Sequence, residues 1–172
     1  DQKLVKKYLP SIDSVLNFFD SHLAETGLVG HTGGPIMRDR YWSFIDWSTK
    51  WGNNGGVPDA VNQKTRSLTA ESLLYIYGLQ KAAELAEYIG RKDTAEEYRE
   101  RVRKVAEAVQ RECFGTYTDP DGITRRLLQD GPGVDEYSVH TQVFGILAGV
   151  VTSAEGKEML HATVGNPELA QA

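Results

Sequence analysis

The sequence predicts an all-α fold in which helical hairpins form part of a double ring of helices. Three observations lead to this prediction. Helical segments with one apolar face alternate with segments that are apolar on all sides, which indicates an outer layer facing solvent and an inner layer buried on both sides. Residues 27–66 form a long loop that contains every tryptophan of the chain. A strong turn signal at residues 119–122 predicts one short β-hairpin.

The first helix is expected over residues 3–25. Its apolar residues recur at helical spacing along one face, and they are Leu4, Tyr8, Ile12, Val15, Phe19 and Leu23. Pro10 lies inside this segment and predicts a kink or a break, because proline lacks the backbone N–H that a helix interior needs. Gly27 is the expected stop signal.

The next two helices are expected over residues 69–89 and 94–114. The first of these is apolar nearly all the way round, which is typical of a helix buried on most sides. The second has a single apolar stripe with charged residues opposite, and it begins with Asp93-Thr-Ala-Glu96, a sequence of the capping-box type. The pair therefore predicts one inner and one outer helix.

The hairpin is expected around residues 117–124, and a second all-apolar helix over residues 136–151, with Asp135 and Glu136 as its cap and first-turn acid. Thr152 to Glu155 predicts the capped start of a short helix. Asn166-Pro167 predicts the start of another.

Length, charge and cysteine content restrict the function. With 172 residues the chain holds about half of the helices that a closed ring needs, so residues 1–172 are predicted to form a single partial domain. The net charge is −5 and the basic residues form no stripe, which argues against a nucleic-acid partner. No apolar run is long enough to span a bilayer. The lone cysteine, Cys113, is interpreted as a small buried hydrophobe. These features leave the cellular compartment open.

The candidate site lies where the two inner helices begin. The Trp-rich loop leads into the first inner helix, and residues 135–140 are expected to form the first turn of the second, so both ends should open on one rim. Indole rings pack on the C–H faces of a sugar, and a carboxylate accepts hydrogen bonds from its hydroxyl groups. The candidate ligand-binding residues are therefore Trp42, Asp46, Trp47 and His140.

Two interpretations of these residues stay open at this point. They form a sugar site, in which Trp42 would share a face with Asp46, and Trp47 with Trp51, if residues 42–51 were helical. Alternatively, the tryptophans anchor a long loop to the core, Asp46 caps a turn, and His140 is an ordinary core or rim histidine. The sequence contains no phosphate-binding loop, no complete calcium-binding loop and no recognisable Ser/His/Asp catalytic triad. No metal, cofactor or catalytic residue is predicted.

Four motifs, in this order, resemble the bacterial α-L-rhamnosidases. Trp42-Ser-Phe-Ile-Asp-Trp47 is followed by a glycine-rich loop, then by Leu-Tyr-x-Tyr-x-Leu from Leu74 to Leu79. Ala-x-x-Tyr-x-x-Arg spans Ala95 to Arg101, and Glu-Tyr-Ser-Val-His-Thr spans Glu136 to Thr141. The resemblance covers nearly the whole chain.

The resemblance implies an (α/α) six-hairpin barrel that hydrolyses terminal α-L-rhamnosides with inversion, without a metal or an organic cofactor. It also implies that Trp42 and Trp47 wall the rhamnose pocket, that Asp46 supports it and that His140 lies near the same rim. The implied partner is a rhamnose-containing glycan or glycoside.

The chain departs from the family pattern at both catalytic carboxylates. Inverting hydrolysis needs an acid and a base roughly 6.5–9.5 Å apart. In the family the acid lies in an Arg-Asp/Glu-Glu-Arg-x-Gly-Trp segment before the Trp cluster, and the base lies in a Trp-Glu segment well downstream; neither segment occurs here. The chain alone is therefore expected to be an inactive fragment that supplies pocket wall and self-associates through exposed apolar surfaces. The alternatives are a fragment of another six-hairpin glycosidase and a non-catalytic helical module that binds carbohydrate or a protein partner.

Overall fold

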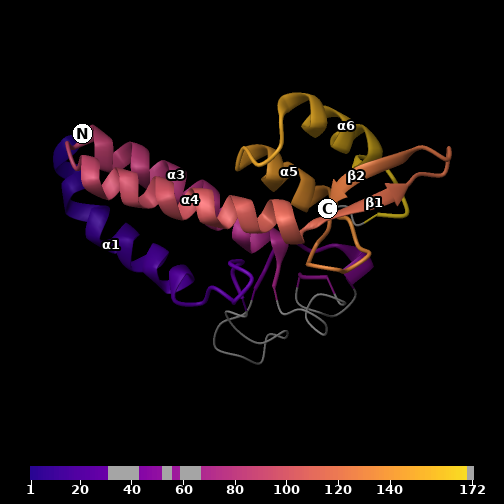
Figure 1. Cartoon of the computed structure of the whole chain (residues 1–172), viewed down its shortest axis with the longest axis horizontal. Coiled ribbons are helices and arrows are strands. Elements are labelled where there is room, and N and C mark those ends of the chain that lie inside the picture. Colours follow the sequence, from indigo (N-terminus) through magenta and orange to yellow (C-terminus); the bar gives the residue numbers. More distant parts are fainter. Residues whose placement is uncertain (31–42, 52–55, 59–66, 170–172) are drawn as a thin grey trace.

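The computed structural model describes residues 1–30, 43–51, 56–58 and 67–169. Its elements are α1 (Gln2–Asp20), the short 3-10 helix η1 (Thr49–Trp51), α3 (Thr69–Tyr88), α4 (Lys92–Glu112), β1 (Phe114–Thr118), β2 (Thr124–Leu128), α5 (Val139–Leu147) and α6 (Ser153–Thr163). Helices α1, α3 and α4 lie side by side at one end of the molecule, while α5, α6 and the β-hairpin form the other end (Figure 1). The predicted fold class, helical with one short hairpin, is confirmed.

Helix α3 lies at the centre of the described structure. It packs against α1, α4 and α5, and Leu73, Ile76 and Leu79 are completely buried. Three of its large apolar residues, Leu74, Tyr77 and Tyr88, remain exposed. An apolar helix of this kind is stable only with neighbours on several sides, as its sequence predicts.

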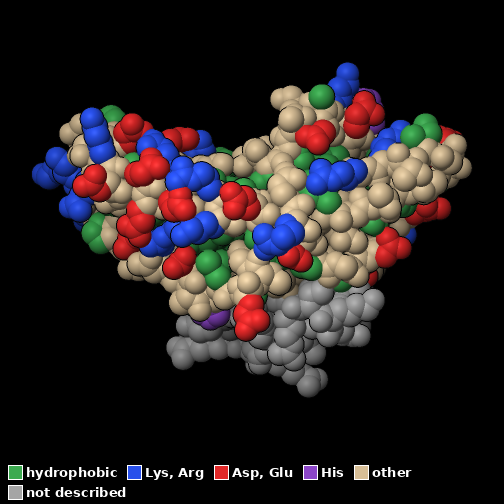
Figure 2. Space-filling view, viewed as in Figure 1, with side chains coloured by type: hydrophobic (Ala, Val, Ile, Leu, Met, Phe, Trp, Pro, Cys, Tyr) green, Lys and Arg blue, Asp and Glu red, His purple; other side chains and the backbone are tan. Residues whose placement is uncertain are grey.

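Helix α4 covers α3 and faces solvent with its opposite side. Figure 2 shows Lys and Arg interspersed with Asp and Glu over the α1 and α4 end of the molecule. Arg103, for example, pairs with Glu96 and Glu100. The predicted capping box is wrong, because α4 begins at Lys92 with Arg91 as its N-cap and no side-chain cap. The tight connection after α3, in which the Arg91 N–H donates to the Ala86 carbonyl, starts the helix early.

Helix α1 continues through Pro10, so of the two outcomes expected there the break does not occur. The helix also ends at Asp20 instead of continuing to residue 25. Beyond it the chain folds back on itself through a bridge between Leu23 and Val29, so Gly27 lies in that turn with a φ of 85°. The buried face is also shifted. Leu9 and Leu16 enter the core with Ile12 and Phe19 beside them, while Leu4, Tyr8 and Val15 are exposed.

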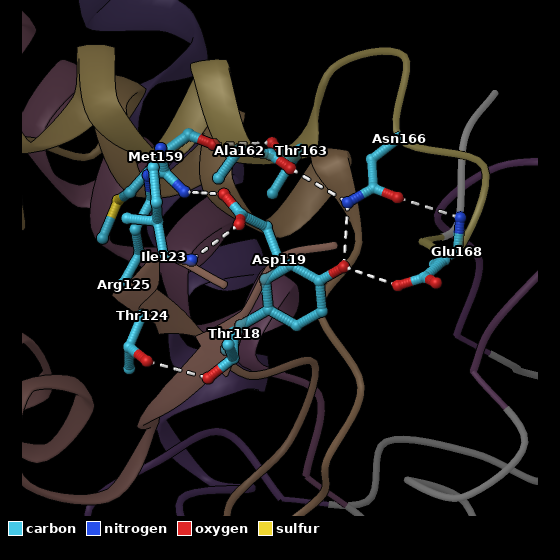
Figure 3. Close-up of polar contacts among 11 residues, drawn as sticks. Thr118, Asp119, Ile123, Thr124, Arg125, Met159, Ala162, Thr163, Asn166 and Glu168 are labelled. Atoms are coloured by element: carbon cyan, nitrogen blue, oxygen red, sulfur yellow. Dashed lines mark hydrogen bonds and ion pairs between the residues drawn. The ribbon is translucent and has the colours of Figure 1, made fainter. Parts of the chain in front are cut away.

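The predicted hairpin is confirmed. Strands β1 and β2 pair antiparallel, and the Asp119 carboxylate closes their turn by accepting the Ile123 N–H at 2.9 Å. Figure 3 shows Asp119 directed toward Ile123 and Arg125, and Asn166 and Glu168 at the ring hydroxyl that belongs to Tyr117. The Asn166 amide and the Glu168 carboxylate each lie 2.9 Å from that hydroxyl, which fixes the hairpin to the segment after α6.

The capping box predicted for α6 is confirmed, since the Thr152 side chain and Glu155 bond each other's backbone N–H groups. The predicted start of α5 is wrong by three residues. Ser138 is the N-cap, so Asp135 and Glu136 precede the helix. The helix expected at Asn166 is not formed over residues 166–169. The Asn166 side chain instead accepts the Glu168 N–H at 3.0 Å, which holds a turn.

Cys113 follows α4 as its C-cap and is completely buried. Burial raises the pKa of its thiol to about 11. The interpretation of Cys113 as a buried hydrophobe therefore agrees with its surroundings. Within the described residues, no helix is long and apolar enough to cross a membrane.

Candidate functional site

The described part of the Trp-rich loop lies over the beginnings of α3 and α5. A small apolar cluster joins the three segments, in which Val57 from the loop, Leu68 before α3 and Val134 before α5 are buried together. Ile45 packs against this cluster. The loop is thereby held at the end of the two inner helices where their N-termini lie, which we call the rim.

Asp46 and His140 meet at this rim. The Nε2 atom of His140 lies 3.1 Å from Oδ2 of Asp46, although the residues are far apart in sequence. The other carboxylate oxygen of Asp46 accepts the Trp47 N–H at 2.7 Å. These contacts, first the Trp47 N–H and then His140, lower the pKa of Asp46 below its ordinary value of 3.8. Asp46 is 42% exposed and His140 only 12%, so the carboxylate is the member of the pair that solvent reaches.

The second ring nitrogen of His140, Nδ1, is buried and has no hydrogen-bond partner among the residues that the structure describes. A hydrogen on Nδ1 would be a buried, unsatisfied donor, which is costly. In the neutral ring the geometry therefore favours a hydrogen on Nε2, donated to Asp46.

The two described tryptophans of the cluster have opposite environments. Trp51 is only 4% exposed, and its ring centre lies 5.4 Å from that of His140. Trp47 is 62% exposed and stands edge-on to Phe44, with 5.3 Å between ring centres. Trp51 thus packs in the interior against the imidazole of His140, and the ring of Trp47 is exposed to solvent.

The helical alternative for residues 42–51 is wrong in the described part, because residues 43–48 form no helix and only Thr49–Trp51 makes a 3-10 turn. The physical reason lies in the loop's own pairing. The backbone N–H groups of Ile45 and Asp46 both donate to the Gly56 carbonyl, at 2.9 and 3.3 Å, and not to residues four positions earlier. Trp47 and Trp51 consequently share no face.

Gly56 is required at its position for two reasons. Its φ of 83° lies in the left-handed region that favours glycine. A Cβ atom there would stand 2.5 Å from Cδ2 of Phe44. The close approach of Gly56 therefore sets the position of the Phe44 ring, and through it the edge-on contact with Trp47.

The predicted site residues are placed as follows. Asp46 and His140 are in direct contact, and Trp47 adjoins them through its backbone N–H, with its exposed ring against Phe44. Trp42 lies outside the described residues. Sequence reasoning missed Trp51 as a neighbour of His140; its membership of the Trp cluster was the available signal.

Sequence reasoning also missed Asp130, which is 1% exposed and bonds the N-cap of α5. The only hint was an acidic residue directly before a Gly-Pro-Gly turn and a Ser-x-x-Thr cap. Elsewhere, no group of three His, Cys, Asp or Glu side chains within the described ranges is arranged to hold a metal ion.

Comparison with known families gives a match over residues 1–167, to the family described as the bacterial alpha-L-rhamnosidase 6 hairpin glycosidase domain. A comparison with curated proteins gave no match.

Two solved structures share the fold. One is a GH78 family rhamnosidase of Bacillus sp. GL1, with a TM-score of 0.70 and 20% identity over 99% of this chain and 16% of that one. The other is a rhamnosidase from Klebsiella oxytoca with rhamnose bound, with a TM-score of 0.59 and 22% identity over 96% of this chain and 26% of that one. The chain thus spans about a sixth and a quarter of these two proteins. The match over nearly the whole length shows that the chain belongs to the bacterial α-L-rhamnosidase six-hairpin glycosidase family.

Proposed function

We propose that this chain forms part of the sugar-binding wall of a glycoside hydrolase domain that cleaves terminal α-L-rhamnosides with inversion. Family membership supports the reaction class. The similar Klebsiella oxytoca rhamnosidase, which has rhamnose bound, supports the choice of sugar. The observation that carries the proposal is the Asp46–His140 pair at the rim, with Trp51 beneath it and Trp47 exposed beside it.

The pair has the chemistry that a sugar hydroxyl needs. Both oxygens of Asp46 already accept one hydrogen bond each, and an ionised carboxylate has further acceptor positions. The lowered pKa keeps this carboxylate ionised at neutral pH. The exposed ring of Trp47 offers an apolar face for the C–H groups of a sugar. Trp42, outside the described residues, is proposed to belong to the same wall.

The acid and the base of the reaction are proposed to lie outside residues 1–172. Inversion requires two carboxyl groups roughly 6.5–9.5 Å apart, one protonating the leaving oxygen and one activating water. Neither of the segments that would supply them occurs in the sequence. The chain is accordingly proposed to be the central part of a six-hairpin catalytic domain, without hydrolase activity of its own.

Tryptophan fluorescence tests the sugar-binding proposal directly, because all three tryptophans lie between residues 42 and 51. We expect a saturable change in emission with L-rhamnose and none with D-glucose or L-fucose. Asp46→Asn should abolish the response. Arg103→Ala, on the solvent face of α4, is the matched control and should leave it unchanged. Silence with rhamnose in both this chain and a longer protein that carries it would contradict the proposal.

Hydrolysis of 4-nitrophenyl α-L-rhamnoside tests the proposal that the catalytic acid and base lie outside residues 1–172. We expect no turnover by residues 1–172 and turnover by a protein with the missing segments, with the β-anomer of rhamnose as the first product seen by NMR. Turnover by residues 1–172 alone would place the acid and base inside this chain.

The exposed apolar residues of α1 favour the further proposal that the chain self-associates. Leu4, Tyr8 and Val15 are exposed on a helix whose other face enters the core. Analytical ultracentrifugation should show dimers or larger species that dissociate in a Leu4→Lys, Val15→Lys double variant. A monomer at all concentrations would favour a self-contained module instead.

A further inference from the structure

The carboxylate of Asp130 lies in the interior beside the rim, and its bonds converge on the start of α5. Asp130 is 1% exposed. Its two oxygens accept the Ser138 N–H at 3.1 and 3.0 Å, and one of them also accepts the Ser138 hydroxyl at 2.6 Å and the Thr141 hydroxyl. A carboxylate is buried at a cost, so such a site persists only when hydrogen bonds compensate for the lost water, as those of Ser138 and Thr141 do here.

The backbone of Asp130 binds a second helix. Its carbonyl accepts the N–H of Thr69, the first residue of α3, at 3.0 Å. Leu68, the N-cap of α3, supplies no side-chain cap. The Asp130 N–H donates to the Glu136 carbonyl at 2.8 Å, which closes the loop before α5. One residue therefore connects the beginnings of the two inner helices.

His140 belongs to the turn that Asp130 holds. It is the second residue of α5, between Val139 and Thr141, and Thr141 bonds Asp130 directly. The position of this turn decides whether the imidazole reaches Asp46 and Trp51. A shift of 1 Å would lengthen the 3.1 Å contact between Nε2 and Asp46 beyond hydrogen-bond range.

We propose that Asp130 is a positioning residue of the candidate sugar site, which holds the first turn of α5, and with it His140, against the start of α3. Its part in sugar binding rests on the proposed function above; its part in placing His140 does not. Among the described residues, Asp46 on the loop and Asp130 behind the helix start both interact electrostatically with His140.

Asp130→Asn tests this with little change in shape. An amide has one acceptor and one donor atom, whereas the Ser138 N–H is shared by both oxygens of Asp130. One of the two contacts with the Ser138 N–H thus becomes a donor facing a donor, and we expect the turn to move. Asp119→Asn is the matched control, because Asp119 also accepts a backbone N–H, in the hairpin turn.

The first readout is NMR of the imidazole and needs no sugar. In the unchanged chain we expect cross-relaxation between the ring protons of His140 and Trp51, and a hydrogen on Nε2 of His140. Both signatures should be lost in Asp130→Asn and kept in Asp119→Asn, with a cooperative melt in each. A folded Asp130→Asn chain with both signatures intact would overturn the proposal. If that variant does not fold, Thr141→Val, which removes one donor to Asp130 at similar volume, should weaken the same cross-peaks; unchanged cross-peaks would overturn it equally.

The second readout is rhamnose affinity in the same samples. We expect Asp130→Asn to weaken binding by about tenfold or more, as misplacement of a binding group by about 1 Å does. Equal affinity despite a displaced His140 would overturn the role of Asp130 in the sugar site. No binding by the unchanged chain or by a longer protein that carries it, together with loss of the His140 signatures in Asp130→Asn, would refute the proposed function and leave the positioning role supported.

Discussion

The loop at Asp46 and the junction at Asp130 approach the same turn of α5 with the same functional group, and they differ in almost everything else. Asp46 lies on a loop without regular structure and solvent reaches its carboxylate. Asp130 is completely buried, between the starts of two helices. Backbone and imidazole contacts lower the pKa of Asp46, whereas burial raises that of Asp130 against the opposing effect of its hydrogen bonds.

This difference between Asp46 and Asp130 distinguishes a residue that positions a site from a residue that can contact a ligand. Asp130 is completely buried and bonded to Ser138 and Thr141, so it has no means of reaching a ligand. Asp46 keeps acceptor capacity toward solvent, and its geometry depends on residues behind it. Loops carry binding groups in this way because a rigid scaffold fixes them from beneath. Substitutions in the two regions should therefore differ in their effects on stability and on binding.

The largest effect is expected for Asp130→Ala. It removes the acceptor of the buried Ser138 N–H and of the Ser138 and Thr141 hydroxyls, and only one of these hydroxyls can then donate to the other. We expect the free energy of unfolding to fall by about 3–5 kcal/mol, measured by urea denaturation. Asp46→Ala should leave the urea midpoint nearly unchanged. Similar midpoints for the two variants would remove the distinction between the regions.

Trp51→Ala should be the next largest. Trp51 is buried against His140, and removal of a buried aromatic ring lowers the free energy of unfolding by about 3 kcal/mol. Trp47→Ala removes an exposed ring and should have a much smaller effect on stability while weakening the rhamnose response. Thermal melts of both variants check this, and equal losses would show that Trp47 also anchors the loop.

Gly56→Ala should destabilise the loop by about 1–3 kcal/mol, since both backbone strain and contact with Phe44 oppose a Cβ atom. Gly133→Ala separates the two causes. Gly133 also has a positive φ, of 68°, but a Cβ there would meet nothing within 4 Å. We expect the smaller loss at Gly133 in chemical denaturation. Equal losses would mean that the Phe44 contact adds nothing.

The smallest effect concerns pH. The folded pKa of Asp46 is lowered, so its contribution to stability is present above 3.8 and is lost as the pH falls through the lowered value. The stability difference between the unchanged chain and Asp46→Asn should therefore vanish on acidification from about pH 6 to about pH 2. Asp130 has the opposite sign, because its raised pKa makes the ionised form a cost that grows as the pH rises through that value. A difference for Asp46→Asn that increased in acid would contradict this.

Much of the fold was predictable because helical periodicity reports burial locally. The burial of α3 on several sides and the solvent-facing charged side of α4 can each be predicted from the residues of one helix alone. The errors arose where a second segment decides the outcome. The core selects Leu9 and Leu16 of α1 in preference to Tyr8 and Val15, and Asp130 moves the start of α5 to Ser138.

The candidate site was predictable in residue type and not in arrangement. Asp46 beside tryptophans, and His140 at the start of an apolar helix, are visible in the sequence. The contact between Asp46 and His140 is not visible in the sequence. It depends on the hydrogen bond from the Ile45 N–H to the Gly56 carbonyl and on the hydrogen bonds that Asp130 accepts at the start of α5. Trp51 was not selected for the same reason, since nothing in a single sequence shows whether Trp47 or Trp51 is buried.

The buried thiol of Cys113 also gives the molecule a practical property. A thiol reacts with labelling reagents as the thiolate, and one that is completely buried with a pKa of about 11 offers almost none at neutral pH. Because the chain has no other cysteine, a cysteine introduced at an exposed position such as Lys50 would be the single reactive group. A fluorophore or spin label attached there would follow the rim loop, residue by residue if the position is varied, without background from the core.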